Sequence, residues 1–242
     1  AERVRQAADK TAAAGSARVT LNVALSGAGV SAAVTGDGVL DLDERRGALN
    51  LDLGSLGSSL GGSRSVEAVL DRGGLFVKLP ALLTAAKPWL KVDLAALSAP
   101  AGINLGPLGQ LKSADPAQAL AFLKGAASDV KKVGTETVRE ASTTHYRGTM
   151  NLRDAAAALP AEASKTVDDV AAALGTTTIG ADVWLDDEGR MRKMRFGVDA
   201  GGGGAGGSVE FEMYDFGVAA DVRMPPAEQV TDLAAFLSGG PR

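Results

Sequence analysis

Apolar and polar residues alternate along much of this chain, in one segment after another. A period of two places every second side chain on the same face of a β-strand. The pattern therefore predicts one large antiparallel sheet with an apolar face and a polar face. The alternating apolar residues are Val19, Leu21, Val23, Leu25, Leu49, Leu51, Leu53, Leu90, Val92, Leu94, Ile179, Ala181, Val183, Leu185, Met194, Phe196, Val198, Val209, Phe211 and Met213.

Helical and loop segments interrupt the strand pattern. Strands are predicted near residues 18–26, 30–42, 46–53, 65–71, 74–79, 89–94, 129–139, 143–152, 177–186, 191–199, 208–215 and 217–223. Helices are predicted over 2–14, from Asp115-Pro116 onward, over 153–174 and after Pro225-Pro226, with loops over 54–63 and 95–114. Because the strand pattern resumes after each helix, residues 1–242 are interpreted as a single domain of the α+β class.

One hairpin can be predicted in register. The turn signal Asp187-Glu188-Gly189-Arg190 lies between two alternating runs whose apolar residues must face the same way. A tight turn about Glu188-Gly189 then pairs Val183 with Met194. On the polar face it pairs Asp182 with Arg195 and Trp184 with Lys193, which brings opposite charges and a cation–π contact together. A solvated sheet face is the ordinary role of such charges.

Composition narrows the function classes. The apolar fraction of 45% excludes general disorder, whereas aromatic residues make up only 4%. The core must therefore be filled by Leu, Val and Ala, or it is not completely filled. The net charge of −4 argues against a nucleic-acid partner and against a polybasic membrane-surface protein. Cysteine is absent, which excludes disulfides, thiolate chemistry and cysteine-based zinc sites. No cofactor or metal is expected.

The sequence leaves two cellular locations open. No apolar run is long enough to cross a bilayer. The segment Ala1 to Ala14 is charged and helical in character, unlike a signal peptide. The protein is therefore expected to be either cytoplasmic or a mature or trimmed form of an exported chain.

His145 is the only histidine, so a Ser-His-Asp triad would have to use it. Tyr146, Gly148 and Met150 share one strand face, and His145 lies on the opposite face with Arg147. That opposite face is predicted to be solvated, which disfavours a catalytic role for His145.

Acidic residues cluster at predicted strand ends and turns. Paired carboxylates could serve a glycosidase, but their usual role at such places is solubility and turn formation. The stretch from Asp186 to Gly189 lacks the spacing of an EF-hand loop. The acidic residues concerned are Asp41, Asp43, Glu44, Asp182, Asp186, Asp187 and Glu188.

Two further features are weighed against ordinary structural roles. The glycine-rich run from Gly201 to Gly207 lacks the Lys-Ser/Thr and helix of a phosphate-binding loop, so a flexible hairpin tip is expected, with gating of a cavity as a weaker hypothesis. Trp184 lies on the predicted outer face among charges. It is a candidate contact for a partner or a membrane, against the alternative of edge packing on a helix or a lysine stem.

The strongest functional indication is architectural. A long, bent sheet with helices against its apolar face can enclose a large dry cavity, although a solid core would produce the same alternation. The chain resembles the actinobacterial LppX/LprA/LprF/LprG lipoprotein family, which is related in shape to the LolA and LolB carriers. The resemblance rests on the opening helix before long strands, on residues 143–150 before an Ala-rich helix, and on residues 181–193. The Ala/Gly/Arg-rich composition is typical of a high-GC actinobacterium.

The resemblance implies a half-barrel: a large curved antiparallel sheet with helices packed on its concave face, enclosing a hydrophobic cavity. It also implies a non-enzymatic carrier of a lipid or glycolipid, monomeric, working with a membrane exporter. Such a protein is tethered outside the plasma membrane, or secreted, and the anchoring cysteine of the family is absent from this sequence. The residues expected to line the cavity are Leu21, Val23, Leu49, Leu51, Leu90, Val92, Leu120, Phe122, Leu123, Val183, Met194, Phe196, Phe211 and Met213.

Three functions remain open at this point. The first is an extracytoplasmic lipid carrier. The second is a non-enzymatic cell-envelope protein with a solid core that acts through a protein partner. The third is a hydrolase that uses His145 or a carboxylate pair.

Overall fold

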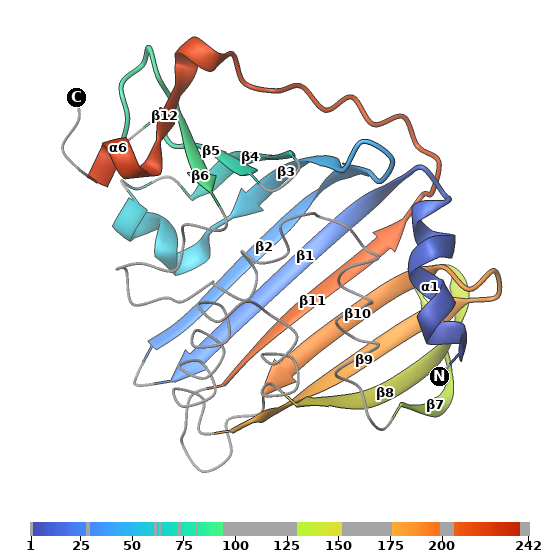
Figure 1. Ribbon diagram of the computed structural model, residues 1–242. Helices are drawn as coiled ribbons and strands as arrows, with labels where there is room; N and C mark the ends of the chain where they lie inside the picture. The colour runs from blue at the N-terminus through green and yellow to red at the C-terminus, as the bar shows by residue number, and fades with distance from the viewer. Residues whose placement is uncertain are drawn as a thin grey trace.

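The protein is built on one open sheet of twelve strands (Figure 1). The computed structural model describes residues 2–27, 30–60, 62, 64–71, 74–80, 82–93, 130–151, 176–198 and 206–237. The strands are β1 (Ser16–Gly27), β2 (Val30–Asp41), β3 (Arg46–Asp52), β4 (Ser65–Asp71), β5 (Gly74–Lys78), β6 (Trp89–Asp93), β7 (Lys131–Val138), β8 (Ala141–Asn151), β9 (Thr178–Asp186), β10 (Met191–Val198), β11 (Gly206–Tyr214) and β12 (Val230–Asp232). The described helices are α1 (Glu2–Ala12) and α6 (Leu233–Leu237), with 3-10 turns η1 (Gly54–Leu60) and η3 (Ala227–Gln229).

The strand order is β12-β6-β5-β4-β3-β2-β1-β11-β10-β9-β8-β7. Every neighbouring pair is antiparallel except β12 and β6, which run parallel. The edge strands β7 and β12 do not pair with each other, so the sheet is not closed into a barrel. The large antiparallel sheet predicted from the alternation is therefore confirmed.

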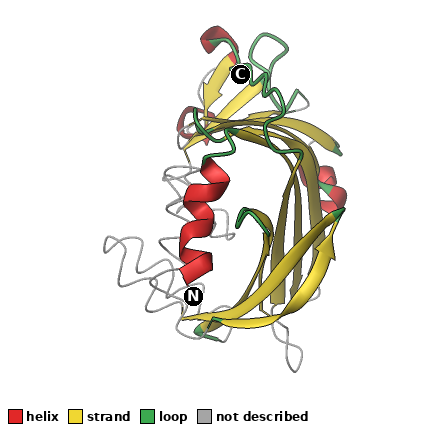
Figure 2. Ribbon diagram, turned by 90° about the vertical axis from the view of Figure 1, so that its right-hand side faces the viewer, coloured by secondary structure: helices red, strands yellow, loops and turns green. Residues whose placement is uncertain are grey.

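The sheet curves strongly, and α1 lies on the inside of the curve (Figure 2). The helix turns a face of small side chains toward the sheet: Ala7 and Ala8 are fully buried, and Val4 is buried beside them. Those alternating apolar residues whose side chains the structure describes share this inner face. Of the predicted helices, the described residues include this one and the short C-terminal helix α6. The predicted helices after Asp115 and over 153–174, and Gly201 to Ala205 of the glycine-rich run, lie outside the described residues.

Two separate clusters of buried residues form the core of the inner face. The first lies under α1 and comprises Val4, Ala7, Ala8, Ala17, Val19, Leu42, Tyr146, Ala181, Val183, Leu185, Met191 and Met213. The second lies toward the opposite edge of the sheet and comprises Leu53, Val66, Leu79, Leu90 and Val92, with Leu233 of α6 packed against it. The buried residues of the two clusters come from different strands. Each cluster therefore packs a different end of the inner face.

The curve passes through a close approach between β2 and β3. Gly38 pairs with Leu49, and a Cβ atom built on Gly38 would lie 2.0 Å from the carbonyl oxygen of Ala48. At Gly36, a Cβ atom would lie 2.6 Å from Cδ2 of Leu51. Backbone of the next strand occupies the space at position 38, so only glycine fits there.

The predicted hairpin register is confirmed. Met194 pairs with Val183, Arg195 with Asp182 and Lys193 with Trp184, and the Lys193 ammonium lies 5.3 Å from the Trp184 ring centroid. The register shifts by one residue between Met191 and Lys193, which the sequence did not indicate. This β-bulge places Arg192 beside the turn.

The prediction for the C-terminal segment was wrong. Residues 217–223 form no strand; the chain from β11 runs extended along the rim of the sheet to reach β6 (Figure 1). Pro225-Pro226 does not open a helix either: η3 and β12 follow, and α6 begins only at Leu233. Val230 is extended because it pairs with Trp89, a tertiary contact that overrides the helical spacing of the segment. No described helix is long and apolar enough to span a bilayer.

Substitution of Gly38 by valine is expected to destabilise the protein by about 1–3 kcal/mol, because β2 and β3 must separate to admit the side chain. Chemical denaturation monitored by circular dichroism measures this loss. Gly134→Val is the matched control, since a Cβ atom at Gly134 in edge strand β7 meets nothing within 4 Å. Equal stability of the two variants would contradict the role given to Gly38.

Candidate functional site

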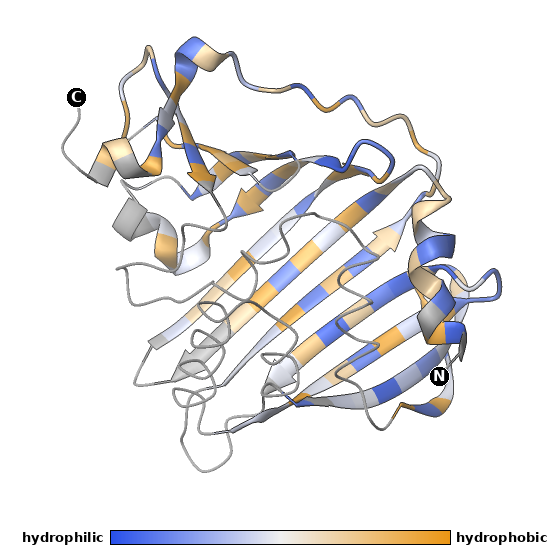
Figure 3. Ribbon diagram, viewed as in Figure 1, coloured by the Kyte–Doolittle hydropathy of each residue, from blue (hydrophilic) through white to orange (hydrophobic). Residues whose placement is uncertain are grey.

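An apolar band crosses the middle of the inner face, between the two buried clusters. Its members are half-buried, in contrast to the closely packed residues at either end. We define the apolar band as Leu21, Val23, Leu49, Leu51, Met194, Phe196 and Phe211. Figure 3 shows the alternation of apolar and polar residues along the strands that carry it.

The residues predicted to line a cavity therefore fall into three groups. Seven form the apolar band. Four are buried in the end clusters: Val183 and Met213 under α1, and Leu90 and Val92 near α6. Leu120, Phe122 and Leu123 lie outside the described residues. The structure thus places the eleven described residues on one face of one sheet, and that they line a cavity stays a prediction.

The chemistry available to the apolar band is restricted to apolar contact. Its side chains are aliphatic, thioether or phenyl groups, and none carries a proton donor or acceptor suited to acid–base work. Side chains of this size gain about 25 cal/mol for each Å² of apolar surface removed from water. A half-buried strip of them is a site for an apolar ligand or for another apolar surface.

The helix α1 is fixed to the sheet at the end of the band. Thr11 is fully buried, and its hydroxyl donates to the carbonyl of Ala7 at 2.6 Å. The same hydroxyl accepts a hydrogen bond of 2.9 Å from the backbone N–H of Met191, at the start of β10. A polar side chain is tolerated in this core because its hydrogen-bonding capacity is used.

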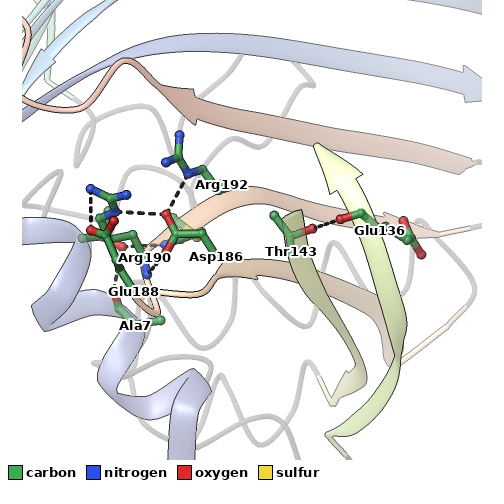
Figure 4. Close-up of polar contacts among 9 residues, drawn as sticks. Ala7, Glu136, Thr143, Asp186, Glu188, Arg190 and Arg192 are labelled. Carbon is green, nitrogen blue, oxygen red and sulfur yellow. Dashed lines mark hydrogen bonds and ion pairs between the residues drawn. The ribbon is translucent and has the colours of Figure 1, made fainter. Parts of the chain in front are cut away.

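A buried carboxylate organises the adjoining β9–β10 turn. Asp186 is 6% exposed and accepts hydrogen bonds from the backbone N–H of Arg190 at 2.8 Å, from Nε of Arg190 at 3.0 Å and from Nε of Arg192 at 2.8 Å (Figure 4). Both guanidinium groups also lie 4.7 Å from the ring centroid of Phe216. The sequence analysis missed this cluster, because Arg192 reaches Asp186 only through the bulge.

Burial and hydrogen bonding have opposite effects on the pKa of Asp186. Burial alone would raise the pKa, but the hydrogen bonds from Arg192 and from the backbone and side chain of Arg190 outweigh it and hold the pKa below its usual value. Asp186 is therefore a stable anion that holds the two ends of the β9–β10 turn together.

The outer face differs from the sequence-based expectation at His145. His145 lies on the predicted strand face, but its exposed fraction is only 3%, whereas the sequence predicted a solvated side chain. Its Nδ1 lies 2.8 Å from Oε1 of Glu136, and its Nε2 lies 2.6 Å from Oδ1 of Asp182. The imidazole is covered by the stacked ring of Trp184 and by the Glu136 and Asp182 side chains of the two neighbouring strands, and strand alternation cannot indicate these contacts.

Trp184 is likewise buried, at 7% exposure, so the expectation of an exposed partner or membrane contact is wrong. Its ring stacks on His145 with a centroid distance of 4.2 Å, and its Nε1 donates to Oε2 of Glu136 at 2.8 Å. Packing against a lysine stem, the alternative interpretation, is closer to the structure because Lys193 lies over the ring. Asp182 contacts His145 and Arg147 in place of the expected partner, Arg195.

The carboxylates singled out by sequence have structural contacts. Asp41 accepts from the backbone N–H of Glu44 at 2.8 Å in the turn before β3, and Glu188 pairs with Arg190 at 2.9 Å. Among the described residues, no group of three or more His, Cys, Asp or Glu is arranged to hold a metal ion. Turn formation, the usual role of such acids, accounts for these contacts.

Two polar grooves of about 440 Å³ each are lined by described residues. The first crosses the outer face of β11, β1, β2 and β3, where Asn22, Asp37 and Asn50 line it. The second lies under the β7–β8 turn, between Arg139 and Tyr214. Most residues that line the first groove are polar, although Leu21 and Leu51 of the apolar band also line it, and Met213 lines the second.

The arrangement of the sheet matches a known structure. The lipoprotein LppX of Mycobacterium tuberculosis aligns with 92% of this chain and 97% of its own, with a TM-score of 0.56 at 17% identity. The chain has the fold of LppX. The resemblance that the sequence suggested is thereby confirmed for the LppX-like fold.

Sequence comparison adds two relatives from Streptomyces. A 31.2 kDa protein encoded between rplA and rplJ in Streptomyces griseus is 28% identical over 77% of this chain. A protein of Streptomyces coelicolor described as a candidate lipoprotein is 29% identical over 62% of this chain. The chain spans 64% and 44% of the lengths of these two relatives. No protein-family model matches it.

Replacement of Asp186 by asparagine is expected to lower the free energy of unfolding by about 3 kcal/mol at neutral pH, because it removes the buried carboxylate that pairs with the partly buried guanidinium groups of Arg190 and Arg192. An unfolded aspartate titrates near pH about 3.9, and the folded pKa is lower. The stability due to the Asp186 anion is therefore fully present above about pH 4 and is lost as the pH falls through the folded pKa.

Urea denaturation at pH 7 and at pH 3 measures this effect, with Asp187→Asn in the same turn as the control. The difference between wild type and Asp186→Asn should shrink at the acidic pH, and the control should match wild type at both. A loss of stability that is the same at both pH values would contradict the role of the anion.

Proposed function

We propose that this protein is an extracytoplasmic lipoprotein that binds the acyl chains of a lipid or glycolipid over the apolar band. It carries this ligand between the membrane and the cell envelope. The observation that carries the proposal is the half-buried apolar band held between two closed clusters. The LppX-like fold and the relative described as a candidate lipoprotein support the same assignment.

The energetics of such binding are adequate without any catalytic group. Each buried CH2 group contributes roughly 0.8 kcal/mol, so an acyl chain of about sixteen carbons gains about 13 kcal/mol before costs. Ordering the chain and the loss of its overall freedom offset a substantial part of this gain. The remainder is enough for stable but reversible binding, which is what a carrier requires.

The proposal includes a wall of helices on the concave face, with Leu120, Phe122 and Leu123 forming part of the roof of a hydrophobic cavity. The whole chain, residues 1–242, acts as one domain and as a monomer. In this proposal a lipid anchor tethers the protein to the outer face of the plasma membrane. A membrane exporter is its protein partner.

A hydrolase is disfavoured by the surroundings of His145. Both ring nitrogens face carboxylates at hydrogen-bond distance, so neither is free to activate a nucleophile. The nearby hydroxyl of Thr143 donates instead to the backbone carbonyl of Glu136 at 2.7 Å (Figure 4). The proposed protein is therefore a non-enzymatic carrier that needs no cofactor.

Native mass spectrometry with organic extraction, on protein purified from an actinobacterial host, tests the proposal directly. Co-purification of a species of lipid mass, removed by extraction, is the expected result and identifies the class of cargo. An apo mass together with no uptake of added phospholipid or glycolipid would favour instead a solid-core envelope protein that acts through a protein partner.

Phe196→Trp is expected to weaken acyl-chain binding by about tenfold, since a bulkier side chain on the apolar band displaces roughly two CH2 groups of ligand. Titration with a fluorescent fatty acid measures the affinity. Arg195→Trp adds the same side chain to the exposed outer face of the same strand and serves as the control. Wild-type affinity in a folded Phe196→Trp variant would remove this residue from the site.

A further inference from the structure

The apolar band continues to one edge of the sheet along a single row of paired residues. Each member of the row is the register partner of the next, and together they cross six neighbouring strands from edge strand β7 to β1. At a strand spacing of about 4.8 Å, the row is about 24 Å long. Because directly paired residues point to the same face of a sheet, the whole row lies on the inner face. In order, its members are Lys132, Tyr146, Val183, Met194, Phe211 and Leu21.

Near the sheet edge, this row contains a buried hydroxyl group. Tyr146 of β8 is only 9% exposed, and its ring packs in the cluster under α1. Among the described residues, none forms a hydrogen bond with the Tyr146 hydroxyl. The buried side chains of Thr11, His145 and Asp186, by contrast, all have hydrogen-bond partners. A buried tyrosine hydroxyl usually has a partner, since an unpaired one costs stability. The Tyr146 hydroxyl is therefore a donor available to a ligand.

A cation lies next to this hydroxyl at the edge of the sheet. Lys132 of β7 pairs directly with Tyr146, and residues paired in this way have Cβ atoms about 5 Å apart. Val130, two residues earlier, packs against the cluster under α1, which agrees with an inner-face position for Lys132. Lys132 is exposed, and among the described residues it has no ion-pair partner. Its neighbour Lys131 pairs with Arg147 and so lies on the outer face.

The row therefore has the polarity of an amphiphile. Hydroxyl and ammonium groups both donate hydrogen bonds, so together they favour an acceptor that carries negative charge. The other members of the row offer only apolar contact. An acyl chain that lies along the row places its polar end at the open edge, where β7 has no further neighbour in the sheet and Lys132 is exposed to water.

We propose that the ligand of the apolar band carries an anionic oxygen head group, a carboxylate or a phosphate, bound by the Tyr146 hydroxyl and the Lys132 ammonium. The hydroxyl donates one hydrogen bond to a head-group oxygen, and the ammonium contributes its charge from the solvent side. This inference rests on the proposed carrier function. It adds the class of head group and the direction in which the ligand lies on the sheet.

Three single-chain ligands of equal length test the head-group site: hexadecanoate, hexadecyl phosphate and hexadecanol. Displacement of an uncharged fluorescent dye, N-phenylnaphthylamine, from the full chain measures their affinities. Wild type is expected to prefer the two anions over hexadecanol by about tenfold or more. This preference should fall about fivefold in Tyr146→Phe, because a hydrogen bond to a charged group is roughly twice as strong as a neutral one. It should fall about threefold in Lys132→Gln, because an exposed ion pair contributes little.

Lys131→Gln is the matched control, since it removes the same charge from the opposite face of the same strand, and it should keep the wild-type preference. A loss with one anion alone identifies the head group as a carboxylate or as a phosphate, and a loss with both assigns one site to their shared oxygens. An unchanged preference in either folded variant, Tyr146→Phe or Lys132→Gln, or an equal loss in Lys131→Gln, would overturn the inference.

The same measurements separate this inference from the carrier proposal. If all three ligands bind wild type with equal affinity and Phe196→Trp weakens each of them, the acyl-chain site stands and the head-group site is wrong. If none of the three displaces the dye, the carrier proposal fails and this inference fails with it.

Discussion

Strands β2 and β3 approach each other so closely that the carbonyl of Ala48 occupies the space that a side chain at position 38 would need. A flat sheet of this width would expose one long apolar face to water. By curving, the sheet brings its two ends into different surroundings, one under α1 and one under α6. Each end can then close its own cluster of apolar side chains, and the middle of the inner face is left as a band between them.

The two faces of the sheet contain different kinds of buried polar group. On the inner face, the buried hydroxyl of Thr11 beneath α1 both donates and accepts a hydrogen bond. On the outer face, the buried Asp186 carboxylate is paired with Arg190 and Arg192, and the buried His145 ring contacts Glu136 and Asp182.

The sequence predicted local features well and long-range ones poorly. The pairing of Val183 with Met194 followed from alternation and one turn, both of which lie within a few residues. The eleven described cavity candidates fell on one face for the same reason. His145 and Trp184 both contact Glu136 of the neighbouring edge strand β7. The extended path before Val230 depends on Trp89, far away in the chain. Periodicity carries no information on such contacts, and the one-residue bulge before Lys193 has no sequence signal of its own.

The glycines of β2 bear on the choice between a carrier and a solid-core protein. Gly36 and Gly38 lie on the inner face next to the apolar band, paired with Leu51 and Leu49. The leucine side chains lean over the glycines, since a Cβ atom at either position would lie within 2.8 Å of a leucine Cδ2. A solid core gains stability from bulky side chains at the centre of a sheet, because packed volume is what excludes water. Here the centre has glycines instead, with leucine side chains lying over them. Less side-chain volume therefore fills the region where an acyl chain would lie. This distribution of side-chain volume favours a sheet that surrounds a ligand over one that packs on itself.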